Sequence, residues 1–137
     1  MRTKNAFTLI ELVVFITILG VLAAVIIPRL FGRVGESKQA VARQKIAVLE
    51  QQVNLFQTDN ERYPTAQEGL KALIRAPADV SDNWRPYVKD KDILDPWGIE
   101  FYYQFPGRQS FDFDIFTYGS DGQEGGEGEA ADIGNWQ

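Results

Sequence analysis

The sequence contains no cysteine and no histidine among its 137 residues. Without cysteine, the chain cannot build a disulfide scaffold, a thiol nucleophile or a zinc–thiolate site. Without histidine, it also lacks the most common general base and the most common ligand of transition metals. Oxygen ligands remain for a metal ion, and such ligands favour calcium or magnesium.

The composition indicates one globular domain rather than a disordered chain. Hydrophobic residues make up 45% of the sequence, aromatic residues 12% and charged residues 24%. These fractions are typical of folded proteins, and the length suits a single domain with a modest core.

Charge is distributed unevenly along the chain. Residues 1–45 carry seven basic and two acidic residues, a balance of +5, whereas residues 46–137 carry seven basic and seventeen acidic residues, a balance of −10. The acidic part would repel nucleic acid, so we expect no nucleic-acid partner. The basic part surrounds a hydrophobic run, which is typical of a segment oriented in a membrane.

That hydrophobic run covers residues 7–27. As a helix, its 21 residues would be about 31 Å long, close to the thickness of a hydrocarbon core. A secretory signal peptide is the alternative, but the run is longer than the usual hydrophobic region of about 7–15 residues and lacks a small-residue cleavage site at its end. We therefore expect a transmembrane helix that continues into a further helical segment.

Glu11 lies inside this run. An ionised carboxylate in an apolar span costs about 2.5–3.5 kcal/mol on insertion scales, so it requires a partner. No Lys or Arg follows one turn away on the same face. A new amino group at Phe7 could supply the partner if the chain were cut before that residue, within one subunit or between neighbours.

Gly20 and Pro28 are the weak points of the expected helix. Glycine costs about 1 kcal/mol relative to alanine, and proline removes a helical N–H and favours a kink. Two interpretations stay open. Membrane helices tolerate both residues, or residues 20–28 melt and extend when subunits pack.

Residues 1–12, MRTKNAFTLIEL, resemble the class III signal of type IV pilin-like proteins. The resemblance implies that a prepilin peptidase removes residues 1–6 by cutting between Ala6 and Phe7, and that it methylates the new amine of Phe7. Ala6 stands where the family normally has glycine. The resemblance also implies that Glu11 guides subunit register by pairing with the amine at Phe7 of an adjacent subunit.

An amphipathic helical pattern resumes after Pro28 and ends before Pro64, which disfavours helix at the residue before it. Apolar residues spaced by four and three form one stripe: Ala42, Ile46, Leu49, Val53 and Phe56. The sequence thus predicts one long helix of about fifty residues. Thr65 and Glu68 predict the capping box of a second, short helix.

Two strands are expected after a loop over residues 77–91 and a turn at residues 95–98. They cover residues 99–105 and 111–116, joined by a hairpin turn. The second strand alternates, with Phe111, Phe113 and Ile115 on one face and Asp112 and Asp114 on the other. The predicted fold class is therefore α+β, with the long helix packed on a small antiparallel sheet.

The last segment, residues 119–137, holds six glycines and five acids. A disordered tail is the common outcome of such a composition, but Ile133 and Trp136 supply an apolar anchor. The window from Asp121 to Asp132 has the length of an EF-hand loop but lacks its interior ligands and flanking helices. Repelling acids in a glycine-rich loop nevertheless gain order when a hard cation collects their oxygens, which favours calcium.

Four further segments, residues 63–70, 95–98, 118–122 and 132–136, are similar to the major pseudopilin family of type II secretion systems. The resemblance implies a pilin-like fold with a Ca²⁺ site in the C-terminal loop. Carried over, the side-chain ligands are Asp121 and Asp132, and the backbone carbonyls near Tyr118 and Gln123 complete the shell. Weaker candidates follow: Glu124, Glu127 and Glu129.

The function implied is that of the main subunit of a pseudopilus, a filament that drives export of folded proteins across the outer membrane. The implied partners are further copies of the chain, minor pseudopilins, prepilin peptidase and the inner-membrane secretion platform. The chain would cross the bacterial inner membrane once, with its head in the periplasm. Its parts would be the leader 1–6, the transmembrane and assembly helix 7–31, and the head 32–137.

Two other functions share some of these sequence features. A type IV pilus or DNA-uptake subunit would share the signal, but many such pilins close their C-terminal region with a disulfide, and the head lacks a basic patch. A hydrolase could use Asp112 and Asp114, but a solvent-facing strand explains them as well. We therefore expect a structural protein, with no catalytic residue and no enzymatic activity.

Overall fold

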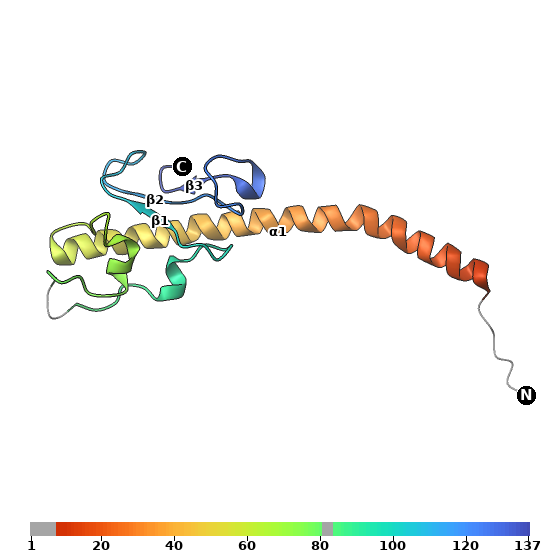
Figure 1. Ribbon diagram of the computed structural model, residues 1–137, viewed down its shortest axis with the longest axis horizontal. Helices are drawn as coiled ribbons and strands as arrows, with labels where there is room; N and C mark the ends of the chain where they lie inside the picture. Colours follow the sequence, from red (N-terminus) through yellow and green to blue (C-terminus); the bar gives the residue numbers. More distant parts are fainter. Residues whose placement is uncertain (1–7, 81–83) are drawn as a thin grey trace, which may run out of the picture. The chain divides into compact units, whose positions relative to one another are not determined.

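The computed structural model describes residues 8–80 and 84–137, and it describes the side chains of all of these except residues 25–34. One α-helix, α1 (Leu9–Asn60), is followed by 3₁₀ helices η1 (Gly69–Leu73) and η2 (Asp90–Ile93). Strands β1 (Tyr102–Gln104) and β2 (Asp114–Thr117), 3₁₀ helix η3 (Gly128–Ala130) and strand β3 (Ile133–Gly134) complete the chain (Figure 1). The chain divides into two compact units, Met1–Val34 and Gly35–Gln137.

The described part of the first unit is helical and apolar. Its large hydrophobic side chains are exposed, from 44% at Val13 to 81% at Leu9. Among the residues that the structure describes, no helix combines the length and hydropathy needed to cross a membrane. Gly20 and Pro28 both lie within the bounds of α1. The melting of residues 20–28 on assembly stays a prediction.

Glu11 has a local partner that the sequence analysis overlooked. Its Oε2 accepts hydrogen bonds from the Thr8 backbone N–H (3.0 Å) and the Thr8 hydroxyl (2.8 Å). The Glu11 N–H in turn donates to Thr8 Oγ1 (3.3 Å). This reciprocal arrangement is a capping box, and it provides acceptors for the N–H groups of Thr8 and Glu11 at the start of α1. Glu11 thus has a partner within the span although no Lys or Arg follows it, because hydroxyl and amide groups also donate to a carboxylate.

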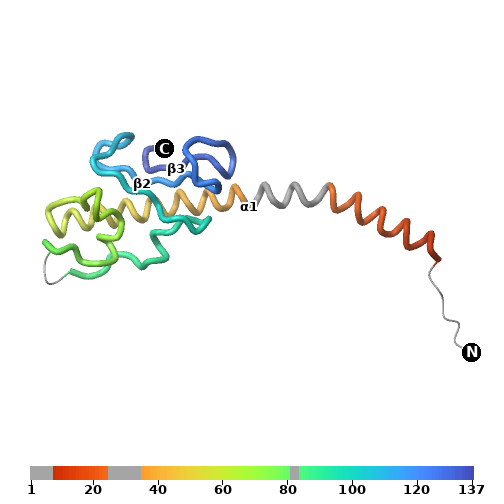
Figure 2. The backbone as a smooth tube through the Cα atoms, in the orientation of Figure 1, coloured from red at the N-terminus to blue at the C-terminus, as the bar shows by residue number. Residues whose placement is uncertain are grey.

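The second unit is built around the apolar stripe of α1, as the sequence predicted. Ala42, Ile46, Leu49, Val53 and Phe56 are each at most 3% exposed. They share a core with side chains of η1, η2, the sheet and the connecting segments. Figure 2 shows these later segments gathered along the C-terminal half of α1. A surface helix with one such stripe must bury it, and here the small sheet and loops do so.

The sheet has three strands in the order β1-β2-β3, all antiparallel. Tyr103 pairs with Ile115, and Phe116 pairs with Gly134. The first two strands are shorter than predicted, and the third was not predicted at all. Strand β3 is short and ends in glycine, so its sequence carries no alternating pattern that would have revealed it.

The turn at residues 95–98 and the capping box are confirmed. Asp95 Oδ1 accepts the N–H groups of Trp97 and Ile99, both at 2.9 Å, and Gly98 takes a φ of 88°. Thr65 N–H donates to Glu68 at 2.8 Å, but the segment that follows is the 3₁₀ helix η1 rather than an α-helix.

The predicted faces of residues 111–116 need correction. Phe113 and Ile115 are buried as expected, but Phe111 precedes β2 and is fully exposed. Asp114, expected to face solvent, is 1% exposed and accepts the N–H groups of Arg108 (2.6 Å), Gln109 (2.9 Å) and Ser110 (2.7 Å). The alternation of buried and exposed side chains fails at Asp114 because the N–H groups of the neighbouring loop need a buried acceptor.

We expect the Asp114 carboxylate to stabilise the β1–β2 loop in a pH-dependent way. Burial alone would raise the pKa of Asp114, but the N–H groups of Gln109, Ser110 and Arg108 outweigh burial and lower it. The stabilisation is therefore present above the unfolded-state pKa of about 3.9 and is lost as the pH falls through the lower folded-state pKa.

Asp114→Asn should lower the free energy of unfolding of residues 32–137 at pH 7 by about 1–3 kcal/mol. It should also flatten the loss of stability in acid. Urea unfolding between pH 2 and 7 measures both effects, with Asp90→Asn as the exposed-carboxylate control. If the free energy of unfolding decreased by the same amount between pH 7 and pH 2 in the wild-type protein and in the Asp114 variant, this role would be contradicted.

Candidate functional site

The acidic loop, residues 118–132, is closed at its base by the sheet. It leaves β2 at Thr117 and enters β3 at Ile133, and these two residues are register partners. The pairing brings Tyr118 and Asp132 together, one on each side of the loop's base. Burial first, and then the negative charges of Glu124 and Asp132, raise the pKa of Tyr118. The unpredicted strand is therefore what closes the predicted site.

Asp121 and Asp132 both hold the loop's backbone. Asp121 Oδ1 accepts the N–H of Gln123 at 3.1 Å, and Asp132 Oδ2 accepts the N–H of Gly125 at 2.9 Å. Asp132 Oδ1 is buried and has no hydrogen-bond partner among the described residues. A buried carboxylate oxygen without a donor is unfavourable unless it meets a cation or a water molecule.

The three glutamates of the loop differ in their surroundings. All three are exposed as residues, but Glu129 also has a contact with α1. The Glu129 side chain lies against Gly35 of α1, where a Cβ on Gly35 would overlap it, and the Glu129 carbonyl accepts the Ser120 N–H at 2.9 Å. The structure thus directs Glu129 toward the helix.

A second contact also joins the loop to α1. Gln39 Nε2 donates to the Gly128 carbonyl. Neither of the two helix residues, Gly35 and Gln39, was predicted to contact the loop. Gly35 did carry a signal, because a glycine within a helix often marks a close approach by another segment.

Among the residues that the structure describes, no three acidic side chains converge closely enough to hold a metal ion. The loop instead offers two aspartates, one of them with a buried free oxygen, together with backbone carbonyls. Consecutive glycines, Gly125 and Gly126, take φ values of 96° and 85° and so turn the chain sharply. Such a loop suits a hard cation that accepts carbonyl and carboxylate oxygens in flexible geometry.

The processing site lies outside the described residues. The predicted cleavage between Ala6 and Phe7 and the methylation of Phe7 stay predictions. Of the predicted assembly residues, Glu11 bonds Thr8 at the start of α1, and Gly20 has no neighbouring atom within 4 Å of its would-be Cβ.

The C-terminal end is held in place by Asn135 and by Trp136, which was expected to act as an apolar anchor. Asn135 Oδ1 accepts the Ile115 N–H and Asn135 Nδ2 donates to the Phe113 carbonyl, both at 3.1 Å. The Trp136 ring lies directly over Gly134, where a side chain would collide with it. These contacts fix the exit of the loop, and with it Asp132.

Two family models match the chain. The model described as Type II secretion system (T2SS), protein G matches residues 29–136, and the model described as Prokaryotic N-terminal methylation motif matches residues 1–27. Together they cover nearly the whole sequence.

Individual relatives agree with the family models. The type II secretion system core protein G of Vibrio cholerae is 42% identical, over 99% of this chain and 94% of the relative. The core protein G of Pseudomonas aeruginosa is 40% identical, over 98% and 96%. The crystal structure of the major pseudopilin from the type 2 secretion system of enterohaemorrhagic Escherichia coli matches with a TM-score of 0.62 and 34% identity, over 80% of this chain and 95% of that one.

The contact between Glu129 and Gly35 should reduce the effect of a helix-stabilising substitution. Gly35→Ala should stabilise residues 32–137 by less than the usual gain of about 0.5–1 kcal/mol within a helix, because the added methyl group displaces the Glu129 side chain. In a Glu129→Ala background the same substitution should give the full gain. Urea unfolding of the wild-type protein, the two single variants and the double variant measures this difference. An equal gain in both backgrounds would show that the contact does not contribute to stability.

Proposed function

Because this chain belongs to the type II secretion system protein G family, we propose that it is the major structural subunit of a pseudopilus that drives export of folded proteins across the outer membrane. The observation that carries the proposal is the family match over residues 29–136. The fold agrees, since the chain is similar to a major pseudopilin over 95% of that solved chain. The same findings favour this function over that of a type IV pilus or DNA-uptake subunit.

The work of such a subunit is assembly. The family is one of structural subunits, and Asp112 and Asp114, the carboxylates that a hydrolase could use, do not share a strand face. Asp114 is buried under the β1–β2 loop, whereas Asp112 is exposed and precedes β2. What the function requires instead is a head of stable shape and a stem that packs against other stems.

For the stem, we propose that residues 7–31 anchor the chain in the bacterial inner membrane before assembly, with the head in the periplasm. The proposal is supported by the apolar run over residues 7–27 and by the high exposure of its described side chains, which leaves them available to lipid or to other helices. The N-terminal methylation motif over residues 1–27 supports cleavage between Ala6 and Phe7 by a prepilin peptidase. The implied partners are further copies, minor pseudopilins and the inner-membrane secretion platform.

For the head, we propose that the acidic loop binds Ca²⁺. The free, buried Oδ1 of Asp132 fits this ion, because a carboxylate oxygen without a donor is an available ligand. Asp121 and Asp132 would supply side-chain oxygens, and Tyr118 and Gln123 would supply backbone carbonyls. The bound ion would neutralise the loop's acids and hold the base of the sheet closed. Glu124 and Glu127 are exposed, and Glu129 lies against α1, so they are weaker candidates.

Calcium should bind residues 32–137 and stabilise them. At a free concentration one hundred times the dissociation constant, the gain in unfolding free energy should be about 2.7 kcal/mol. Asp132→Asn should abolish both the calorimetric heat and the rise in melting temperature, whereas Glu127→Gln should preserve them. If the wild-type head gives neither heat nor a shift, the ion is excluded. If Asp132→Asn binds normally, the ligand set is wrong.

The filament function can be tested through Glu11. In membranes that contain the secretion system, the full chain should form pseudopili that electron microscopy can count. Glu11→Gln should reduce their number at least about tenfold, because the neutral side chain cannot pair with the Phe7 amine of a neighbour.

Thr8→Val is the matched control, since it removes the local hydroxyl partner of Glu11 and keeps the charge. Its filaments should remain as abundant as those of the wild-type chain. Equal losses in both variants would mean that Glu11 acts by capping the helix. A wild-type chain that supports export without filaments would contradict the proposed function itself.

A further inference from the structure

Phe111 has the highest exposed fraction among the described large hydrophobic side chains, at 100%. It lies in the loop between β1 and β2. A single exposed apolar residue is common on protein surfaces and by itself indicates nothing. The surroundings of Phe111 are what distinguish it.

The loop that carries Phe111 is held in one conformation. The buried Asp114 carboxylate accepts three of its N–H groups at 2.6–2.9 Å. The Gly107 N–H also donates to the Asp112 carbonyl at 2.9 Å. An aromatic side chain on a preorganised loop loses little conformational entropy when it docks, which makes it an effective anchor for binding.

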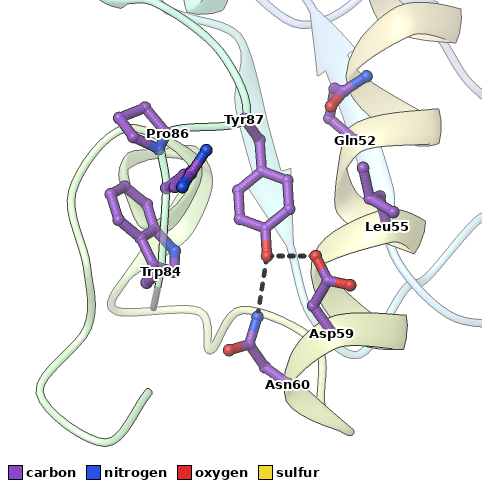
Figure 3. Close-up of a pocket in the computed structure, with 8 residues that line it drawn as sticks. Gln52, Leu55, Asp59, Asn60, Trp84, Pro86 and Tyr87 are labelled. Carbon is purple, nitrogen blue, oxygen red and sulfur yellow. Dashed lines mark hydrogen bonds between the residues drawn. The ribbon is translucent and has the colours of Figure 1, made fainter. Parts of the chain in front are cut away.

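A groove suited to such an anchor lies elsewhere on the same unit. It has a volume of about 480 Å³ and lies between α1 and residues 84–87 (Figure 3). Leu55, which is 47% exposed, lines it together with Trp84, Pro86 and Tyr87. Trp84 Nε1 is buried and has no partner among the described residues.

The walls of the groove are fixed by hydrogen bonds. Tyr87 Oη donates to Asp59 Oδ2 at 2.9 Å and accepts from Asn60 Nδ2 at 3.2 Å, as the dashed lines in Figure 3 show. Trp84 stands edge-on to Tyr87, with 6.0 Å between ring centroids. The groove therefore exists before anything binds. Half of its lining residues are aromatic or aliphatic and half are polar or charged. Its apolar half suits an aromatic side chain that is flanked by polar groups.

The β1–β2 loop and the segment over residues 84–87, which lines the groove, lie on opposite sides of α1 (Figure 1). Phe111 is fully exposed, so it does not fill the groove of its own chain. A contact between two different patches of identical chains is heterologous. When such a contact repeats from copy to copy, it builds either a closed ring or an open filament. A filament forms if the rotation that relates neighbouring copies does not return to the first copy.

Charge complements this arrangement. Arg108 and Asp112 stand on either side of Phe111 in the sequence, and Asp59 and Arg85 line the groove. Each patch thus carries one cation and one anion. When the loop docks, Arg108 can lie beside Asp59 and Asp112 can lie beside Arg85. This pairing favours a second copy of the chain over a partner that carries charges of only one sign.

We propose that Phe111 of one copy inserts into the groove beside Leu55 and Trp84 of the next copy. This lateral contact between heads rests on the proposed function, because it supposes that copies of the chain assemble into a filament.

The absence of cysteine from the sequence permits a direct test by disulfide cross-linking in the full chain, in membranes that contain the secretion system. Oxidation of the Phe111→Cys, Leu55→Cys double variant should give a ladder of covalent multimers. Each single variant should give none, because it lacks one half of the contact. The Phe111→Cys, Val41→Cys pair is the matched control, since Val41 is 41% exposed on the same helix and does not line the groove.

If filaments form but the Phe111→Cys, Leu55→Cys variant gives no covalent multimers, the contact is refuted and the proposed function is unaffected. The same holds if the Val41 control pair gives an equal series of multimers. A wild-type chain that forms no filaments would overturn both.

A second measurement does not depend on disulfide geometry. Phe111→Ser should leave the melting temperature of the full chain unchanged, because the side chain is fully exposed in its own chain. It should reduce the number of filaments at least about tenfold, through the lost apolar burial between copies. Phe111→Tyr should restore most of them. Filaments of Phe111→Ser as abundant as those of the wild-type chain would refute the proposal.

Discussion

Burial of one apolar stripe of α1 is the interaction on which the rest of the second unit depends. Five side chains, Ala42 to Phe56, lie almost wholly out of solvent. At about 25 cal/mol per Å² of apolar area removed from water, such burial is the main favourable contribution to a fold of this size. The strands are too short to be stable alone, so the sheet persists because it packs on this stripe.

The packed sheet in turn organises two loops with different tasks. The pairing of Thr117 with Ile133 closes the acidic loop and leaves an oxygen of Asp132 buried and free. The β1–β2 loop uses Asp114 as an internal acceptor, and its outermost side chain is Phe111. One loop thus concentrates negative charge that a cation can neutralise, whereas the other presents an apolar anchor. Both are consistent with a head whose function is to hold its shape and to contact its neighbours.

Contacts also connect the acidic loop to the helix. Glu129 lies against Gly35, and Gln39 donates to the Gly128 carbonyl. Gly35 is the first residue of the second unit. Order in the loop is therefore linked, through these side chains, to the part of α1 where the head begins.

Sequence by itself determined the long helix, its buried stripe, the turn at Asp95 and the capping box of Thr65 and Glu68. The family resemblance is likewise a property of the sequence. All of these features depend on the local spacing of residues and on short motifs, so they can be recognised without the structure. Tertiary structure alone decided that β3 exists, that Asp114 is buried and that Phe111 is exposed. It also decided that Glu129 turns to α1. Those features depend on which distant backbone donors and surfaces meet once the stripe of α1 is covered, and no local pattern encodes that meeting.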